Sequence, residues 1–282
     1  MSIEVRTART FAEVLASIES IKKAWKVPAE EEEIWFRGSS NGIHPLLPGI
    51  LRPSAVARQL EEATLLQTFQ AYAAPLVTNH AGSEWDWYFL AQHHRLPTRL
   101  LDWSESLAVA LFFAIEGVSR SSGSRPRAGS NRGSGLNAKL AGKSVVWMLE
   151  AGTLNEYSVS QDLIVTTPGP TSDPYLPSSA QGRSGERSKH GVGAGTYPIA
   201  ILPPRSNPRI AAQHGVFTIH GSATVAIEEI ASSNLRVKLG AIAIEHARAE
   251  RVSEELQMLG VNQMVIYADL DHVAEHVKNI YS

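Results

Sequence analysis

The amino-acid sequence predicts an α+β fold, in which a single domain combines a helical first half with a mixed sheet. Helical patterns dominate the first half of the chain and strand patterns the second, without the regular alternation that produces parallel βαβ units. The chain has 282 residues, of which 43% are hydrophobic, so it can bury a substantial core. We therefore expect residues 1–282 to form one domain.

The first expected element is a helix at Phe11–Trp25, within an N-terminal segment of residues 1–30. Its apolar side chains recur at steps of three and four residues, which is the period of an amphipathic helix. Thr10 and Glu13 have the spacing of a capping box at its start. Pro28 prevents its continuation.

A strand is expected at 34–37, where aromatic and branched residues precede Gly38 and two serines. The stretch 41–53 contains prolines and glycines and predicts a loop. Good helix formers fill residues 56–74. A third helix, after those at 11–25 and 56–74, is expected at 84–94, shortly before a proline that ends it.

Residues 98–102 predict a short strand or turn. Ser104 is a suitable helix N-cap, and Glu105 lies in the first turn of a helix that runs to about Ile115. Because this helix is apolar on nearly every side, we expect it to be central in the fold.

The second half of the chain predicts mainly strands. We expect them at 145–149, 215–220, 224–230, 237–244 and 264–267. Two helices complete the pattern: 247–259, which Gly260 closes as a C-cap, and 270–280.

Two long loops interrupt these elements, at 119–144 and 168–196. The first is rich in serine and glycine and has six basic residues and no acidic one. This composition predicts a flexible insertion or, alternatively, a mobile basic arm that contacts phosphate. The second is rich in proline, glycine and serine, and loops of this length often border a functional site.

Composition and charge exclude several kinds of site. The chain has no cysteine, which excludes disulfides, thiolate zinc sites, iron–sulfur clusters and a cysteine nucleophile. Its 26 basic and 28 acidic residues give a net charge of -2. That balance argues against nucleic-acid binding by the whole surface, but not by a local basic patch. We find neither a signal-peptide pattern nor a run of about 20 apolar residues, so we expect a cytoplasmic protein that does not enter a membrane.

Candidate functional residues concentrate in three segments, at 35–38, 92–103 and 207–217. Arg37 is the first candidate, because it ends an aromatic strand directly before a flexible Gly-Ser-Ser. Gln213 is the next candidate, because the polar residues Gln213 and His214 come directly before Gly215, where a strand is expected to begin.

Four further residues have two open interpretations. Arg99 and Asp102 are either a buried ion pair at the strand-to-helix turn or part of a catalytic site. His93 is either a general base or a hydrogen-bonded core residue. Trp103 is either part of the core or a surface on which a flat ring stacks.

These segments resemble the FRG-domain family, which is named for the Phe-Arg-Gly found here at Phe36-Arg37-Gly38. The resemblance also takes in the Gln-His at 92–93, the Pro-Thr-Arg-Leu-Leu-Asp-Trp at 97–103, the Gln-x-Gly-x-Phe at 213–217 and the Tyr-Ala-Asp-Leu-Asp at 267–271. It spans roughly residues 34–280. The family is defined largely by sequence and occurs mainly in bacterial and phage-related proteins, so it implies little about function.

A weaker resemblance, to the NAD-dependent ADP-ribosyltransferases, suggests a fold and a chemistry. It rests on a strand that ends in Arg-Gly, then a strand-to-helix segment with Thr or Ser and an apolar helix that ends in Phe-Phe-Ala. It implies an ADP-ribosyltransferase-like fold with NAD as the substrate. Arg37, beside Gly38 and Ser39, would grip the phosphates or ribose through its rigid donor fork.

The same resemblance implies a pocket for the nicotinamide ribose. Thr98, Arg99 and Ser104 would help to form it together with the candidate acid Asp102. Trp103 or Trp35 would stack on the flat ring.

The sequence departs from these transferases at one position. Many of them carry a catalytic glutamate in a Gln/Glu-x-Glu turn, and the matching Gln213-His214-Gly215 has a glycine there. Either another acid serves, with Asp102, Glu105 and Glu150 as candidates, or the domain does different chemistry, or it only binds.

The leading hypothesis is an enzyme that transfers ADP-ribose from NAD to a nucleic acid or protein acceptor. Its candidate catalytic residues are Arg37, His93, Asp102 and Gln213, and no metal is expected. The resemblance implies a bacterial toxin or phage-defence effector, which in turn implies an antitoxin or other partner protein.

Two other hypotheses stay open. A module that binds nucleic acid or a nucleotide without turnover would use Arg37, Arg99, Arg209 and the basic stretch 119–144. A metal-independent nuclease would use His93, His214 and an acid.

Overall fold

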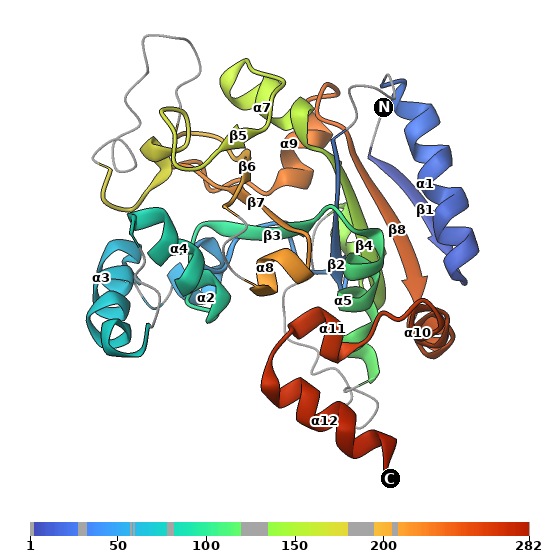
Figure 1. Ribbon diagram of the computed structural model, residues 1–282. Helices are drawn as coiled ribbons and strands as arrows, with labels where there is room; N and C mark the ends of the chain where they lie inside the picture. Colours follow the sequence, from blue (N-terminus) through green and yellow to red (C-terminus); the bar gives the residue numbers. More distant parts are fainter. Residues whose placement is uncertain are drawn as a thin grey trace.

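The fold is built on a mixed sheet with helices on both faces (Figure 1). A computed structural model describes residues 3–27, 33–56, 58, 60–77, 82–119, 135–179, 195–204 and 208–281. The eight strands of the described residues are β1 Glu4–Ala8, β2 Ile34–Ser39, β3 Leu100–Ser104, β4 Lys143–Glu150, β5 Val165–Thr166, β6 Ile199–Leu202, β7 Gly215–Ile219 and β8 Leu239–Glu245. Their order is β1-β8-β4-β2-β3-β7-β6-β5, with β1–β8 and β5–β6 parallel and the other neighbours antiparallel. The predicted mixed sheet is confirmed.

The helices fall between the strands without regular alternation. In the described ranges they are α1 Phe11–Trp25, α2 Pro53–Val56, α3 Glu62–Ala73, α4 Glu84–His93, α5 Leu107–Ser119, α6 Leu136–Leu140, α7 Ala151–Val159, α8 Pro208–Ala212, α9 Ile227–Ser233, α10 Ala249–Met258, α11 Gln263–Tyr267 and α12 Leu270–Ile280. Short 3-10 turns lie at Gly49–Leu51, Ala74–Leu76, Asp173–Tyr175 and His246–Arg248. Within these ranges, each helix is too short or too polar to span a lipid bilayer.

The sheet consists of two halves that meet at a single residue pair. β2 pairs with β4 along its whole length, from Ile34 to Ser39, and β3 pairs with β7 along its whole length. Between β2 and β3 only Phe36 and Ser104 are paired. Beyond this point the two strands diverge, and β3 runs across the direction of β2, β4 and β8 (Figure 1). The divergence leaves the end of β2 free to form one side of a cavity.

Buried apolar side chains cover both faces of the sheet. α1, α5 and α10 pack on one face of β2, β4 and β8, and α7 and α9 lie with the opposite face. A third cluster joins α3 and α4 to β3, β6 and β7. Helix α5 is buried along much of its length, as expected for a helix apolar on nearly every side.

Several predicted elements are confirmed. α1 occupies the predicted residues, and the Thr10 hydroxyl accepts a hydrogen bond from the Glu13 amide at 3.2 Å as its cap. The expected helices at 84–94 and 270–280 correspond to α4 and α12. The helix expected at 56–74 begins later, at Glu62.

Two predicted strands are wrong, because both segments are short helices. In the segment 224–230, Ile227 and Ile230 lie three residues apart and are both buried in α9. In the segment 264–267, the Asn262 side chain accepts a hydrogen bond from the Val265 amide and starts α11. A run of four to seven apolar and polar residues fits both the helical and the strand period. The N-cap and the buried positions therefore determine that these segments are helices.

The predicted N-cap of α5 is also wrong. Ser104 is the last residue of β3, and α5 begins three residues later, at Leu107. The Ser104 hydroxyl accepts a hydrogen bond from the Ser106 amide at 2.9 Å, so it shapes the turn into the helix instead of capping it.

Both predicted long loops lie partly outside the described residues, at 120–134 and 180–194. In the remainder of 119–144, α6 forms and β4 has begun by Lys143. In 168–196, a 3-10 turn lies at Asp173–Tyr175. The flexibility of these loops and the single-domain organisation stay predictions.

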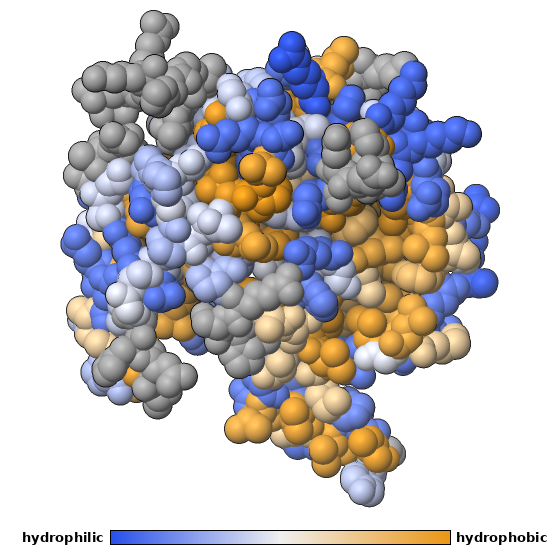
Figure 2. All heavy atoms as spheres, turned by 45° about the horizontal axis from the view of Figure 1, so that its top comes forward, coloured by the Kyte–Doolittle hydropathy of each residue, from blue (hydrophilic) through white to orange (hydrophobic). Residues whose placement is uncertain are grey.

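The C-terminal helix α12 projects from the body of the fold (Figure 1) and carries hydrophobic side chains on its surface (Figure 2). None of its residues is buried. Leu270, Val273, Val277 and Ile280 are exposed, at the spacing of one helix face.

Candidate functional site

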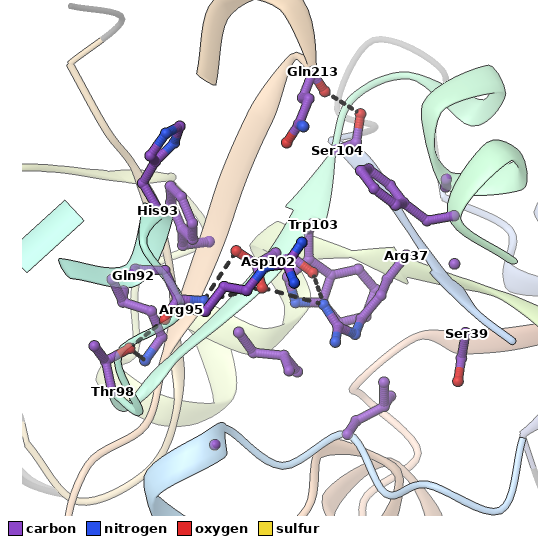
Figure 3. A pocket seen from close by; sticks show the side chains of 18 of the residues that line it. Arg37, Ser39, Gln92, His93, Arg95, Thr98, Asp102, Trp103, Ser104 and Gln213 are labelled. Carbon is purple, nitrogen blue, oxygen red and sulfur yellow. Dashed lines mark hydrogen bonds and ion pairs between the residues drawn. The ribbon is translucent and has the colours of Figure 1, made fainter. Parts of the chain in front are cut away.

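A cavity of about 600 Å³ opens where β2 and β3 diverge. Its walls come from both strands, the start of α5, the end of α4, α8 and the segment between β2 and α2 (Figure 3). Nine of the predicted site residues line it: Arg37, Gly38, Ser39, His93, Thr98, Asp102, Trp103, Ser104 and Gln213. The structure therefore brings together residues from 37 to 213 in one place, whereas Arg99 and Trp35, which were also predicted for the pocket, are absent from the walls.

Asp102 lies in the cavity between Gln92 and Arg37 (Figure 3). The Gln92 amide nitrogen donates to both carboxylate oxygens of Asp102 at 3.0 Å. The Thr98 hydroxyl donates to Oε1 of Gln92 at 2.6 Å, which fixes the orientation of that amide. The carboxylate is thus positioned as a hydrogen-bond acceptor that faces the cavity.

Arg37 approaches Asp102 from the other half-sheet. Its Nη1 donates to the backbone carbonyl of Asp102 and lies 3.7 Å from Oδ2. Burial lowers the pKa of Arg37, Asp102 opposes that effect, and nearby Arg52 lowers the pKa further. The side chain of Arg37 is 21% exposed and that of Asp102 58% exposed, so both groups can be reached from the cavity.

His93 lies on the wall opposite Arg37 and Ser39, across Asp102 (Figure 3). Burial, followed by Arg209 and His94, lowers its pKa to about 4. The imidazole is therefore neutral at pH 7 and can accept a proton or a hydrogen bond.

Ser104 and Gln213 close the end of the cavity near α8. The Ser104 hydroxyl donates to the Gln213 backbone carbonyl at 2.7 Å, and the Gln213 side-chain amide donates to the Ile266 carbonyl at 3.1 Å. These bonds tie β3, the α8–β7 turn and α11 together. Both side chains therefore shape the wall of the cavity.

Gly38 brings α5 against the end of β2. A Cβ atom at this position would lie 1.9 Å from the Ala110 carbonyl oxygen and 2.5 Å from the Ala114 amide nitrogen. Real Cβ contacts are never this short, so the helix can approach only because residue 38 has no side chain. The glycine next to Arg37 thus sets one wall of the cavity.

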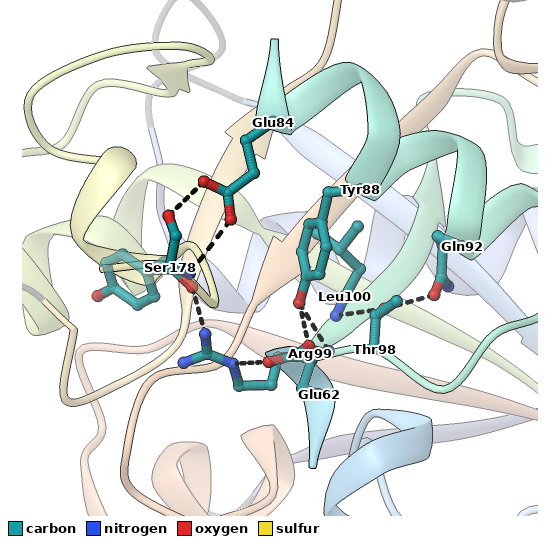
Figure 4. A network of polar contacts seen from close by, with 9 residues as sticks. Glu62, Glu84, Tyr88, Gln92, Thr98, Arg99, Leu100 and Ser178 are labelled. Carbon is teal, nitrogen blue, oxygen red and sulfur yellow. Dashed lines mark hydrogen bonds and ion pairs between the residues drawn. The ribbon is translucent and has the colours of Figure 1, made fainter. Parts of the chain in front are cut away.

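Arg99 points away from the cavity into a buried polar network (Figure 4). Its Nε lies 2.6 Å from Oε2 of Glu62 and its amide donates to Oε1 of Glu62 at 2.7 Å. Its guanidinium also donates to the Tyr175 carbonyl, and Tyr88 donates to Glu62. Arg99 is therefore in a buried ion pair, but with Glu62 and not with Asp102 as the sequence suggested.

The two tryptophans expected as stacking surfaces are core residues. Trp35 is buried and does not line the cavity, and Trp103 is buried with its indole nitrogen donating to the Thr218 hydroxyl at 3.1 Å. Partly buried Phe113 and the ring of Tyr267 are the aromatic groups near the α5 wall.

Of the three acids considered as substitutes for the missing glutamate, only Asp102 lines the cavity. Glu150 is buried, and its carboxylate accepts from the Thr153 amide at 2.7 Å as the N-cap of α7. Glu105 is outside the cavity walls. Among the described residues, Asp102 is the one carboxylate in the lining.

Sequence reasoning missed several residues of the site. Three arginines join Arg37 in the lining: Arg52, Arg95 and Arg209. The sequence indicates Arg209 only for a module that binds nucleic acid or a nucleotide, and it predicts only a loop for the segment that contains Arg52. No local sequence pattern brings these three into one cavity with Arg37.

Trp147 was also missed. It pairs with Arg37 across β4 and β2, lines the cavity, and is fully buried. Its indole nitrogen has no hydrogen-bond partner within the described part of the chain. A buried donor without a partner at a cavity wall is available to an acceptor on a ligand.

In the described part of the chain, neither the nuclease pair nor a metal site is assembled. His93 lines the cavity but His214 does not. His272 bonds Asp269 at 2.6 Å through Nδ1, and the described residues contain no group of three or more His, Asp or Glu side chains able to hold a metal ion.

Comparison with known proteins identifies part of the chain. No curated protein and no solved structure matches it. The family model of the FRG domain matches residues 32–123. The Gln-x-Gly-x-Phe and Tyr-Ala-Asp-Leu-Asp pieces lie beyond this match. The segment that matches the FRG-domain model supplies Arg37, His93 and Asp102 to the cavity.

Proposed function

We propose that this protein is an NAD-dependent ADP-ribosyltransferase-like enzyme, which transfers ADP-ribose to a nucleic acid or protein acceptor. One observation carries the proposal: Arg37, Asp102 and the residues around them converge on one cavity at the point where the sheet divides. Its volume of about 600 Å³ lies within the usual range for pockets that bind small molecules.

The cationic end of the cavity suits the diphosphate of a dinucleotide. The Arg37 guanidinium stays charged and offers a planar donor fork to phosphate oxygens. Arg52 lies close enough to act on the charge of Arg37, and the indole N–H of Trp147, unpartnered among the described residues, adds a neutral donor on the adjacent strand. Together they form a phosphate-binding end, and Asp102 is the one acidic side chain that the described residues contribute to the lining.

Asp102 is the candidate for the role of the missing glutamate. In the transfer, the bond between the ribose C1′ and the nicotinamide nitrogen breaks with its electron pair going to nicotinamide. The acceptor then bonds to C1′ and loses a proton. Asp102 stabilises the positive charge that develops on the ribose, and Gln92 keeps its carboxylate oriented. Neutral His93, on the facing wall, is placed to accept a hydrogen bond from the acceptor, whose proton passes to solvent.

An enzyme that consumes NAD in this way fits a toxin or phage-defence effector that acts in the cytoplasm and is controlled by an antitoxin or another partner protein. A second candidate function is binding of a nucleotide or nucleic acid without turnover. It is favoured by the glycine at position 215, where the transferases carry glutamate.

The test uses NAD labelled in its ADP-ribose part, with RNA, DNA and protein acceptors. We expect the wild-type protein to release nicotinamide and to label an acceptor, and Arg37→Gln to lower the rate by about a hundredfold or more. Arg236→Gln is the matched control, because Arg236 is exposed and outside the cavity. Absence of both nicotinamide release and label with every acceptor contradicts the transferase proposal, and salt-sensitive binding without product then supports the binding module.

A further inference from the structure

The turn that connects α4 to β3 carries an exposed arginine into the wall of the cavity. Arg95 lies two residues beyond the end of α4, is exposed and lines the cavity (Figure 3). Its side chain makes no hydrogen bond and no ion pair within the part of the chain that the structure describes. A guanidinium has five N–H donors, so Arg95 is available to a group that enters the cavity.

The other three arginines of the lining already have partners. Arg37 donates to the Asp102 carbonyl, Nε of Arg52 donates to the Leu47 carbonyl at 3.0 Å, and the guanidinium carbon of Arg209 lies 4.9 Å from the centre of the Tyr267 ring. Each of these contacts fixes an arginine head group in the wall. Arg95 differs from them because the described chain uses none of its side-chain donors.

The backbone around Arg95 is held by a rigid turn. The Arg95 amide donates to the Gln92 carbonyl at 2.9 Å, and the Leu96 amide donates to the Ala91 carbonyl at 3.0 Å. These are the two bonds of a Schellman motif at the end of a helix. The same turn holds Gln92, whose side chain orients Asp102. One rigid unit therefore positions both Arg95 and the candidate catalytic carboxylate.

This turn places Arg95 where glycine fits best. Arg95 has a φ of +65°, a left-handed conformation that glycine adopts at the lowest cost. Such a conformation does not by itself mark a site, because Lys26 at the end of α1 has a φ of +56° and lies outside the cavity lining. The difference between the two residues is where their side chains lie. Lys26 is therefore a matched control for Arg95.

We infer that Arg95 binds the diphosphate of NAD. This inference rests on the proposed function, because it adds a residue to the substrate site of the same cavity. NAD carries its negative charge on the diphosphate alone, and a guanidinium matches phosphate oxygens in charge and in geometry. The single carboxylate that the described residues contribute to the lining, Asp102, is already held by Gln92 and Arg37. A phosphate of the substrate is the anion that remains for Arg95.

Replacement by glycine separates binding from stability. Arg95→Gly removes the guanidinium and gives the turn the residue that its conformation prefers, so its melting temperature should equal or exceed that of the wild type. Its affinity for NAD should fall about tenfold, as expected for loss of a charge-assisted hydrogen bond. Arg95→Lys, which keeps the charge, should recover part of the affinity. Lys26→Gly should keep both the melting temperature and the affinity for NAD.

Calorimetric titrations with NAD and with ADP-ribose measure the affinities. ADP-ribose retains the diphosphate and has no nicotinamide to lose, so the same tenfold loss is expected with it, independently of catalysis. In steady-state assays, Arg95→Gly should raise KM for NAD about tenfold and change kcat less than about twofold, because the diphosphate is remote from the bond that breaks.

Equal affinities of the wild type and Arg95→Gly for both ligands overturn the inference. So does a lower melting temperature of Arg95→Gly with unchanged affinity, which is the result of a purely structural role, and so does a wild type that binds neither ligand. A wild type that binds ADP-ribose but releases no nicotinamide contradicts the proposed function, and the titrations alone then decide whether Arg95 holds the diphosphate.

Discussion

Two arginines of the FRG segment lie in opposite environments. Arg37 stands beside the cavity next to an exposed carboxylate, whereas Arg99 is buried with Glu62, with side-chain exposures of 9% and 12%. Burial lowers the pKa of Arg99, but the carboxylate of Glu62 outweighs this effect and the pKa is raised. Arg99 therefore links α3, α4 and β3, and Arg37 remains available to a ligand.

This contrast predicts different effects on stability. Arg99→Ala leaves the Glu62 carboxylate buried and unpaired, so we expect the free energy of unfolding to fall by about 3–5 kcal/mol. Arg37→Ala removes a partly exposed pair and should cost about 1 kcal/mol or less. Urea denaturation followed by circular dichroism measures both. A larger loss in Arg37→Ala than in Arg99→Ala would mean that the two roles are reversed.

For single residues, the sequence predicts which side chains are candidates for the site better than it predicts the partners that these side chains bind. Arg37 stands out because it ends an aromatic strand before a flexible glycine, which is a local feature. The partner of Arg99 was expected to be Asp102, three positions along, but it is Glu62, 37 positions away. No local pattern connects α3 with β3, so the tertiary fold has to supply this contact.

Among the elements, the contact between α5 and β2 does most to define the cavity wall. Both elements were predicted, the helix as central and the strand as ending at Gly38. Their distance depends on Gly38, whose missing side chain lets the backbone of α5 approach. Gly38, the glycine of the Phe-Arg-Gly motif, is therefore needed for the packing of α5 on β2, in addition to lying beside Arg37.

Substitution of Gly38 tests this packing. We expect Gly38→Ala to lower the free energy of unfolding by about 1–3 kcal/mol, because the added methyl group forces α5 away from β2. Gly142→Ala is a useful comparison, since a Cβ at Gly142 meets no atom within 4 Å and its cost comes from its φ of +75° alone. Thermal unfolding of both variants gives the measurement. An unchanged melting temperature in Gly38→Ala would show that the helix and strand are not in close contact.

The sequence predicts the secondary structure of short elements poorly. α1 and α12 were predicted within their bounds because each holds its period for more than ten residues. The two helices mistaken for strands, α9 and α11, have seven and five residues. Over that length a helical and a strand period place apolar residues almost equally well, and packing against neighbours determines the result.

Across the whole molecule, the sheet positions the cavity by joining its halves at one residue pair. The mixed sheet was predicted from the strand-rich second half of the chain. Its strand order was not, because the chain crosses between the halves after β2, after β3, after β4 and again after β7. Convergence of Arg37, His93, Asp102 and Gln213 follows from that order.

Buried histidines make stability depend on pH. Burial and Arg99 lower the pKa of His220 to about 3, and the pKa of His93 is lowered to about 4. Below the ordinary pKa of 6.5 the unfolded chain takes up protons that the folded chain does not. Stability is therefore full above about pH 6.5 and falls as the pH is lowered toward 3.

The effect of His220 can be isolated. Between pH 6.5 and about pH 3, His220 contributes about 1.4 kcal/mol per pH unit to the slope of the free energy of unfolding against pH. We expect urea unfolding midpoints of the wild type to fall steadily from pH 6.5 to pH 4, and those of His220→Leu to fall less steeply. The comparison uses the slope with pH, so a constant packing change in the variant does not affect it. Parallel slopes in the two proteins would contradict the lowered pKa.

We propose that the cavity between the two half-sheets uses Asp102 to cleave NAD. The most direct test is nicotinamide release measured by chromatography, comparing the wild type with Asp102→Asn and with Arg236→Gln as the control. The Asp102→Asn substitution keeps the shape of the side chain and removes its charge. We expect release by the wild type and the control, and a loss of about a hundredfold in Asp102→Asn. Release by Asp102→Asn at the wild-type rate, or none by the wild type, would contradict this proposal.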